Sequence, residues 1–207
     1  GLGAEVTIAY RGEQILRGFD DDVRHHLHDE LVRKGLDVRL QCDLRSIRTW
    51  LRSALAATLV TAGTPQQLEV DAVMFATGRQ PVTAGLGLEA AGVQLDAHGG
   101  VIVDEYSRTS VPHIYAVGDV TNRVALTPVA IREGAAVATT LFGGQRVAVD
   151  HRDVPHAVFS QPPVGTVGLS EAAAAAAYES VDVYTATFRP LKYTLSGRNE
   201  RTLVKLV

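Results

Sequence analysis

The sequence is poor in cysteine, in methionine and in charge of one sign, and each shortage excludes a class of protein. Cys42 is the only cysteine, which excludes a framework of internal disulfides and indicates a reducing, cytoplasmic compartment. The formal net charge is −3 and the lysines and arginines are scattered, so the sequence offers no basic surface for nucleic acid. Charged residues interrupt every apolar run before it reaches the length of a membrane span. We therefore expect a protein that binds neither nucleic acid nor membrane.

The beginning of the chain also lacks the usual signals. Met74 is the only methionine, and the sequence opens at Gly1 without an initiator or a signal-like segment. We therefore expect an internal piece of a longer protein. Its composition, with 46% hydrophobic and 21% charged residues, is typical of folded globular domains.

Residues 1–80 alternate strand and helix signals in the manner of a nucleotide-binding α/β domain. The run at 5–10 (EVTIAY) predicts a strand buried in a parallel sheet. Asp20 is followed by two further aspartates and by apolar residues at intervals of four, which predicts a helix that begins there and ends at Gly35. Further strands are expected at 38–40, 55–60 and 70–75.

Two more blocks follow. In residues 81–153, the apolar stretch 114–117 predicts a buried strand, and Thr127 predicts the N-cap of a helix that runs to Phe142, with a proline at its first position. In residues 154–207, Ser170 and the alanine run behind it predict a capped helix. Strands are expected around that helix at 157–160, 166–169, 181–187 and 202–207.

Two motifs carry the chemistry. Residues 73–81 (VMFATGRQP) end an apolar stretch in Ala-Thr-Gly, where the absence of a side chain on Gly78 lets the backbone approach a nucleotide closely. Residues 115–119 (YAVGD) end in Asp119, a fixed acceptor for ribose-type hydroxyls. Residues 126–130 (LTPVA) follow soon after. The three segments in this order resemble the class I pyridine nucleotide-disulfide oxidoreductases, and most closely the glutathione reductases of that family.

The resemblance covers essentially the whole chain and implies its fold. It implies an α/β protein made of a partial three-layer NADP-binding domain at 1–80 and an FAD-domain segment at 81–153. An α+β dimerisation domain, the interface domain, would begin at 154–207. It also implies FAD and NADP as cofactors, a homodimer, and an enzyme that uses NADPH to reduce oxidised glutathione and so maintains thiol redox balance.

The end of the first strand bears on the choice of nucleotide. In dinucleotide-binding folds an acidic residue there binds the ribose of NAD, whereas arginine accommodates the additional phosphate of NADP. This sequence has Tyr10 and then Arg11, and Arg17 follows in the same loop. Two guanidinium groups can form charge-assisted bonds to one phosphate, and both positions match the phosphate-binding arginines of glutathione reductases. A solvated pair of surface arginines is the alternative.

The resemblance assigns the other site residues as well. Gly78 would contact NADP, and Arg79 would lie near the flavin pyrophosphate or the nucleotide. Asp119 would bind the ribityl chain of FAD, with an ordinary helix cap as the alternative. Thr127 would lie at the flavin ring, where the helix N-terminus stabilises negative charge on the reduced ring.

The parts of that family that do the disulfide chemistry are not in these 207 residues. The redox cysteine pair and the C-terminal His-Glu segment are both missing, so we assign no catalytic residue and expect this piece alone to be inactive. Ala135 stands where many glutathione reductases carry an arginine for a substrate carboxylate, and residues 131–136 (IREGAA) also resemble trypanothione reductase. Another flavin disulfide reductase, or a non-catalytic nucleotide-binding and dimerisation module, remains an alternative.

The single cysteine and a group of three histidines are better explained by structural roles than by catalysis or metal binding. Cys42 lies in a strand-like segment without a second thiol, which favours a half-buried structural cysteine. Three histidines, His25, His26 and His28, fall on one predicted helix without the spacing of metal ligands, which favours a solvated face and no metal.

Overall fold

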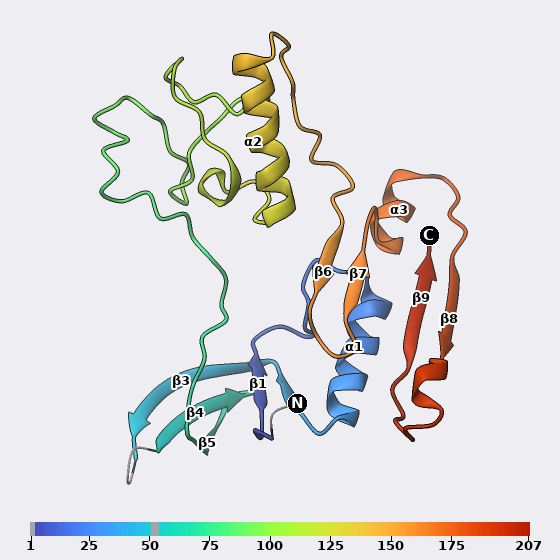
Figure 1. The fold of residues 1–207 in the computed structure, drawn as a ribbon. Coiled ribbons are helices and arrows are strands. Elements are labelled where there is room, and N and C mark those ends of the chain that lie inside the picture. The colour runs from blue at the N-terminus through green and yellow to red at the C-terminus, as the bar shows by residue number, and fades with distance from the viewer. Residues whose placement is uncertain (1–2, 51–53) are drawn as a thin grey trace. The chain divides into compact units, whose positions relative to one another are not determined.

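The computed structural model describes residues 3–50 and 54–207 and divides into two compact units. The first joins Gly1–Phe75 to Pro155–Val207, and the second is Ala76–Val154. Each unit is described by itself below, with the elements labelled as in Figure 1.

The first unit begins with a parallel β-α-β element. Strand β1 (Thr7–Tyr10) pairs in parallel with β2 (Asp37–Leu40), and helix α1 (Asp21–Arg33) connects them. Asp20 caps α1 by accepting from the N–H of Asp22 at 3.1 Å, and Gly35 adopts a left-handed φ of 88° just after the helix. Both ends of this helix therefore confirm the sequence-based expectation.

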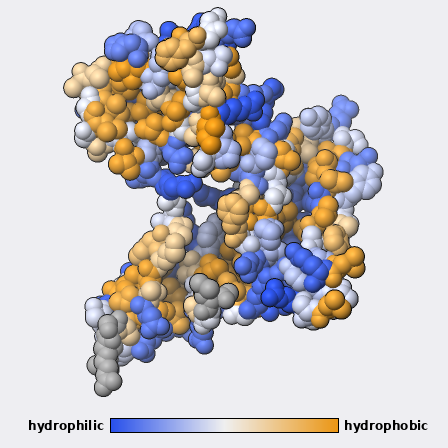
Figure 2. Space-filling model, in the orientation of Figure 1, coloured by the Kyte–Doolittle hydropathy of each residue, from blue (hydrophilic) through white to orange (hydrophobic). Residues whose placement is uncertain are grey.

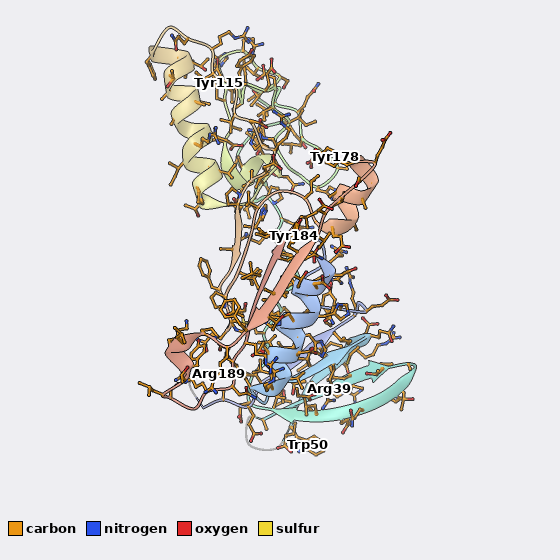
Figure 3. All side chains as sticks on the ribbon, turned by 90° about the vertical axis from the view of Figure 1, so that its right-hand side faces the viewer. Arg39, Trp50, Tyr115, Tyr178, Tyr184 and Arg189 are labelled. Atoms are coloured by element: carbon orange, nitrogen blue, oxygen red, sulfur yellow. The ribbon has the colours of Figure 1, made fainter. Side chains whose placement is uncertain are left out.

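A three-stranded antiparallel sheet follows, made of β3 (Cys42–Thr49), β4 (Leu55–Thr61) and β5 (Thr64–Val70). Ala62 and Gly63 both have positive φ, which suits the tight turn between β4 and β5. In Figure 3, Arg39 lies close to this sheet, and its Nη1 donates to Gln66 of β5 at 2.8 Å.

The strand limits predicted from the sequence are wrong for the two outer strands of this sheet, β3 and β5. No strand was expected at 43–49 or at 64–69, where β3 and β5 lie. The strand expected at 70–75 is wrong, because the pairing with β4 ends at Val70. Apolar character alone does not make a strand, since the backbone needs a hydrogen-bonded neighbour. None of the described residues pairs with 71–75 as a strand.

The remainder of the first unit consists of two hairpins and a short helix. Strands β6 (His156–Val158) and β7 (Val164–Thr166) pair, as do β8 (Tyr184–Phe188) and β9 (Thr202–Leu206). Helix α3 (Glu171–Ala177) is capped by Ser170, which accepts from the N–H of Ala173 at 3.3 Å. The helix expected from the alanine run is confirmed, and the strands expected at 157–160, 166–169, 181–187 and 202–207 have counterparts within a few residues.

The second unit is dominated by loops and one long helix. Helix α2 (Thr127–Phe142) is preceded by a short 3₁₀ turn, η2 (Gly118–Thr121). The strand expected at 114–117 is wrong, because in the described part of the chain Tyr115 forms only an isolated bridge with Arg108. The helix expected to end at Phe142 is confirmed.

Large hydrophobic side chains remain on the surface of both units, as the orange areas of Figure 2 show. In the C-terminal part Phe159 is 95% exposed and Leu195 fully exposed, and β8 is exposed at every residue, Tyr184 (labelled in Figure 3) included. Such surfaces are typical of segments that pack against another chain or domain. In the described ranges, no helix has both the length and the apolar character that crossing a bilayer requires.

Candidate functional site

The loop between β1 and α1 carries the two predicted phosphate-binding arginines. Arg11 directly follows the carboxyl end of β1, which is the end of a parallel sheet where ligands bind in α/β folds. Arg17 lies later in the same loop, three residues before the cap of α1. Both side chains belong to exposed residues. The structure thus places the two arginines on one loop next to a helix N-terminus.

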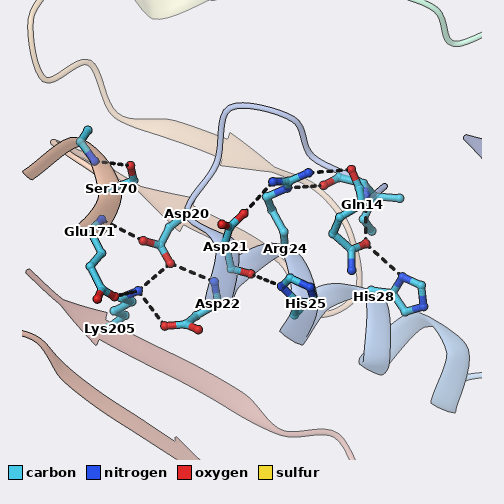
Figure 4. A network of polar contacts seen from close by, with 12 residues as sticks. Gln14, Asp20, Asp21, Asp22, Arg24, His25, His28, Ser170, Glu171 and Lys205 are labelled. Carbon is cyan, nitrogen blue, oxygen red and sulfur yellow. Dashed lines mark hydrogen bonds and ion pairs between the residues drawn. The ribbon is translucent and has the colours of Figure 1, made fainter. Parts of the chain in front are cut away.

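The middle of this loop is buried and held by α1. Gln14 and Ile15 are only 7% and 8% exposed. Arg24 of α1 donates from Nη2 to the carbonyl of Gln14 and from Nε to the carbonyl of Ile15, both at 2.8 Å (Figure 4). His28, one turn further on, lies 3.0 Å from Oε1 of Gln14 through its Nδ1. The sequence reading missed Arg24 and Gln14, because a helical arginine and a loop glutamine carry no motif.

An ion network anchors the start of α1 to the C-terminal part of the same unit (Figure 4). The Nζ of Lys205, on β9, lies 2.9 Å from Asp20, 2.7 Å from Asp22 and 2.6 Å from Glu171. Asp20 also accepts from the N–H of Glu171 at 3.0 Å. The side chains of Lys205 and Asp20 are only 6% and 11% exposed, so the contact between these two is shielded from solvent, whereas Asp22 and Glu171 are about half exposed.

The network shifts the pKa values of Asp20 and Lys205. Burial raises the pKa of Asp20, but hydrogen bonds from Lys205, Glu171 and Asp22 outweigh it and hold that pKa below its ordinary value. Burial lowers the pKa of Lys205, but its bonds to three carboxylates outweigh it and raise that pKa well above the ordinary lysine value. The cap of α1 therefore stays ionised at neutral pH, which favours the helix N-terminus beside the arginine loop.

In the second unit a tight turn presents Asp119. Gly118 has φ of 72°, and a Cβ built on it would lie 3.0 Å from the Cβ of Ala130 on α2, so a side chain there would be both strained and crowded. Asp119 follows immediately in η2 and is exposed. The structure thus brings the Asp119 turn against the first turns of α2.

A buried glutamate on α2 fixes this turn. Glu133 is 1% exposed and accepts from the N–H of Gly118 at 2.6 Å through Oε2. Its other oxygen, Oε1, accepts from Arg123 at 2.9 Å and from Nε2 of His151 at 2.6 Å. The sequence reading missed Glu133, because a charged residue on a helix is usually placed on the solvated face.

The N-terminus of α2 differs from the expectation in one detail. Leu126, not Thr127, is the N-cap, and no side chain caps this end. The prediction that Thr127 is the N-cap is therefore wrong. Because the helix begins at Thr127, Pro128 is its second residue and not its first. The result leaves first-turn N–H groups of α2 without a side-chain cap, at a positive dipole end.

The remaining predicted residues lie in the segment that opens the second unit. Arg79 donates from Nη2 to the carbonyl of Ala125 at 3.1 Å, which ties it to the start of α2. Gly78 is exposed with φ of 115°, and a Cβ built on it would meet nothing within 4 Å. Its backbone therefore needs glycine for conformation, and its close approach to a nucleotide stays a prediction.

The cysteine and the helical histidines occupy structural positions. Cys42 is 2% exposed at the start of β3, more deeply buried than the half-buried strand cysteine expected. His28 lies 3.0 Å from Gln14, and His26, through Nε2, lies 3.1 Å from the carbonyl of Arg201, so the expectation of a fully solvated face is wrong for these two. Only His25 is exposed among the three.

A cavity of about 560 Å³ lies in the first unit between α1 and the C-terminal part. Glu30, Lys34, Tyr193 and Glu200 line it, and none of the predicted site residues does. Each unit therefore carries its own group of candidate residues: the arginine loop in the first unit, and the Asp119 turn with the N-terminus of α2 in the second.

Comparison with known proteins identifies what this arrangement is similar to. A family model described as pyridine nucleotide-disulphide oxidoreductase matches residues 1–134. A second model, described as the dimerisation domain of pyridine nucleotide-disulphide oxidoreductases, matches residues 154–207. These matches confirm the resemblance drawn from the motifs and the mixed α/β fold class.

Individual relatives agree with the family models. The chain is 56% identical to glutathione reductase of Burkholderia cepacia, over 100% of this chain and 45% of that protein. It is 45% identical to trypanothione reductase of Trypanosoma congolense, over 98% of this chain and 41% of that protein. Among solved structures, the HOCl-induced flavoprotein disulfide reductase RclA from Escherichia coli matches with a TM-score of 0.83 and 28% identity, over 98% of this chain and 46% of that one. The chain thus spans less than half the length of these relatives.

Proposed function

Because this chain belongs to the pyridine nucleotide-disulphide oxidoreductase family, we propose that it is part of an FAD-dependent enzyme that uses NADPH to reduce oxidised glutathione. The observation that carries the proposal is the exposed pair Arg11 and Arg17 on the loop at the carboxyl end of β1. Two guanidinium groups there suit the additional phosphate of NADPH, and Tyr10 supplies no carboxylate to repel it. Gly78 is proposed separately as an NADP-binding residue, because its backbone has a φ of 115° that favours glycine.

The residues of the second unit suit FAD. Asp119 is exposed, so ribityl hydroxyls could donate to its carboxylate. The turn that holds it is tightly packed, because Gly118 leaves no room for a side chain. The N-terminus of α2 at Thr127 offers N–H groups without a side-chain cap and a positive dipole end to the pyrimidine part of the flavin. Arg79 lies beside this helix start, where it would add positive charge. When bound, the flavin supplies the redox chemistry that links hydride from NADPH to reduction of a disulfide.

We propose oxidised glutathione as the substrate, because the relative with 56% identity is named glutathione reductase. Trypanothione disulfide is the second candidate, because a trypanothione reductase is 45% identical and because Ala135 is not the arginine expected for a glutathione carboxylate. Ala135 lies on α2 as an exposed residue. The two substrates differ in charge, so they can be separated by experiment.

The domain limits and the assembly belong to the same proposal. The NADP-binding part would end near residue 80, the FAD part would occupy 81–153, and the dimerisation part would begin at 154. The start of the second family model at residue 154 supports the last boundary, and exposed apolar side chains such as Phe159 and Leu195 support a homodimer. A cytoplasmic location suits an enzyme that keeps glutathione reduced.

The test uses the full-length protein that contains this chain. The purified protein should show the absorbance of bound FAD and should oxidise NADPH in the presence of oxidised glutathione, with a lower kcat/KM for trypanothione disulfide. A preference for trypanothione disulfide would favour the second candidate. Absence of bound flavin, or no NADPH oxidation with either disulfide, would contradict the proposal.

A further inference from the structure

The loop that carries Arg11 and Arg17 has neither helix nor strand, yet its middle is as buried as a core segment. The loop runs from the end of β1 at Tyr10 to the cap of α1 at Asp20. The buried pair Gln14 and Ile15 separates the two exposed arginines. The direction in which the arginines point therefore depends on what holds Gln14 and Ile15.

Arg24 holds both of these residues through the backbone. Its Nη2 and Nε donate to the successive carbonyls of Gln14 and Ile15, both at 2.8 Å. Its third nitrogen, Nη1, lies 2.6 Å from the exposed carboxylate of Asp21. A planar fork that binds two successive carbonyls fixes the local course of the chain as well as its position.

The loop makes further contacts that depend on this fixed course. Oε1 of Gln14 accepts from the N–H of Ile15 at 2.9 Å and also contacts His28 of α1. Leu16, directly before Arg17, has φ of 53°, a left-handed conformation that a non-glycine residue rarely adopts unless its surroundings enforce it. Without the fork from Arg24, the loop has a strained residue next to Arg17 and fewer contacts to maintain it.

We propose that Arg24 is a positioning residue for NADPH selectivity: it holds Gln14 and Ile15 so that Arg11 and Arg17 both face the 2′-phosphate. This rests on the proposed function of those two arginines. Each of the three guanidinium nitrogens of Arg24 already makes a contact within the protein, so we assign Arg24 a role through the loop and not as a phosphate ligand.

The test measures binding of 2′,5′-ADP and of 5′-AMP to the full-length protein by calorimetry. If the loop of Arg24→Gln spends about a tenth of its time in the binding conformation, the Kd for 2′,5′-ADP rises about tenfold. The Kd for 5′-AMP, which lacks the 2′-phosphate, should stay within about twofold by the same relation. Arg24→Lys, which keeps the positive charge but lacks the planar fork of the guanidinium, should give a smaller rise and serves as the second variant if Arg24→Gln does not fold.

Asp21→Asn is the matched control, because it removes the charged partner of Nη1 and leaves both carbonyl contacts of Arg24 in place. It should change the 2′,5′-ADP affinity far less than Arg24→Gln does. Equal effects of the two variants, or an unchanged affinity in both Arg24 variants, would overturn the inference.

A third variant separates this inference from the proposed function. Arg11→Met with Arg17→Leu should abolish the preference for 2′,5′-ADP over 5′-AMP, and Arg24→Gln should then have no further effect on that preference. If the double variant keeps the preference, the proposed phosphate site is wrong. If the double variant loses it but Arg24→Gln alone does not weaken it, only the positioning role is wrong.

Discussion

Glu133 should be the most sensitive single position in the second unit. It is 1% exposed and is bound by three donors, the N–H of Gly118, Arg123 and His151. Replacement by glutamine removes the charge and offers only one oxygen, so an amide N–H must face one of these donors. The buried Gly118 N–H or the Arg123 guanidinium then loses its acceptor.

The magnitude follows from these contacts. A buried donor left without an acceptor costs about 1–3 kcal/mol, and breaking a buried ion pair by removing one partner costs about 3–5 kcal/mol. Because Arg123 and His151 are partly exposed, at 24% and 23% of their side chains, the lower part of the second range applies. We expect Glu133→Gln to lower the free energy of unfolding by about 3 kcal/mol.

The assay is urea unfolding of the full-length protein, with Glu89→Gln as the control. Glu89 is an exposed residue of the same unit, so its replacement should stay within about 0.5 kcal/mol. Flavin content gives a second readout, because the turn that Glu133 fixes presents Asp119. A loss of less than about 1 kcal/mol with full flavin retention would refute the reasoning, since it would fall within the effect of an ordinary substitution.

Three further predictions follow from other parts of the chain. Asp119→Ala removes the proposed acceptor for ribityl hydroxyls, a loss of about 1.5–3 kcal/mol, so flavin should leave on extensive dialysis; full occupancy would contradict that placement. The isolated 207-residue chain should not reduce oxidised glutathione with NADPH, because its only cysteine, Cys42, is buried, and measurable turnover would disprove this. The folded pKa values of Asp20 and Glu200 lie below their ordinary values of 3.8 and 4.5, so their contribution to stability is present above those values and is lost as pH falls through the folded ones. Unfolding measured from pH 6 to pH 3 should therefore show a loss of stability, of which only the Asp20 part should be smaller in Lys205→Met, because Glu200 is paired with Lys34; an equal loss would count against the Lys205 network.

The sequence predicted those elements whose signals lie within a few residues of each other. The cap at Asp20, the stop at Gly35 and the capped helix after Ser170 are local, and all three are confirmed. The N-cap assigned to Thr127 was wrong by one residue, because Pro128 suits either of the first two helical positions.

Contacts between distant residues could not be predicted in this way. Lys205 binds Asp20 across 185 residues, and nothing in either local sequence indicates the partner. The same holds for Glu133 and Gly118, where only the fold shows that the helix glutamate is buried. The roles of Arg11, Arg17, Gly78, Asp119 and Thr127 stay predictions, because position alone does not show what a residue binds.

The central claim is that the loop after β1 selects NADPH, and the most direct measurement is kcat/KM with NADPH and with NADH in the full-length enzyme. The wild type should prefer NADPH. Each arginine contact to the phosphate should contribute about 1.5–3 kcal/mol, so Arg11→Met with Arg17→Leu should remove much of the preference while NADH use changes little. An unchanged ratio of NADPH to NADH efficiency in the double variant would show that Arg11 and Arg17 are surface charges and would contradict the account.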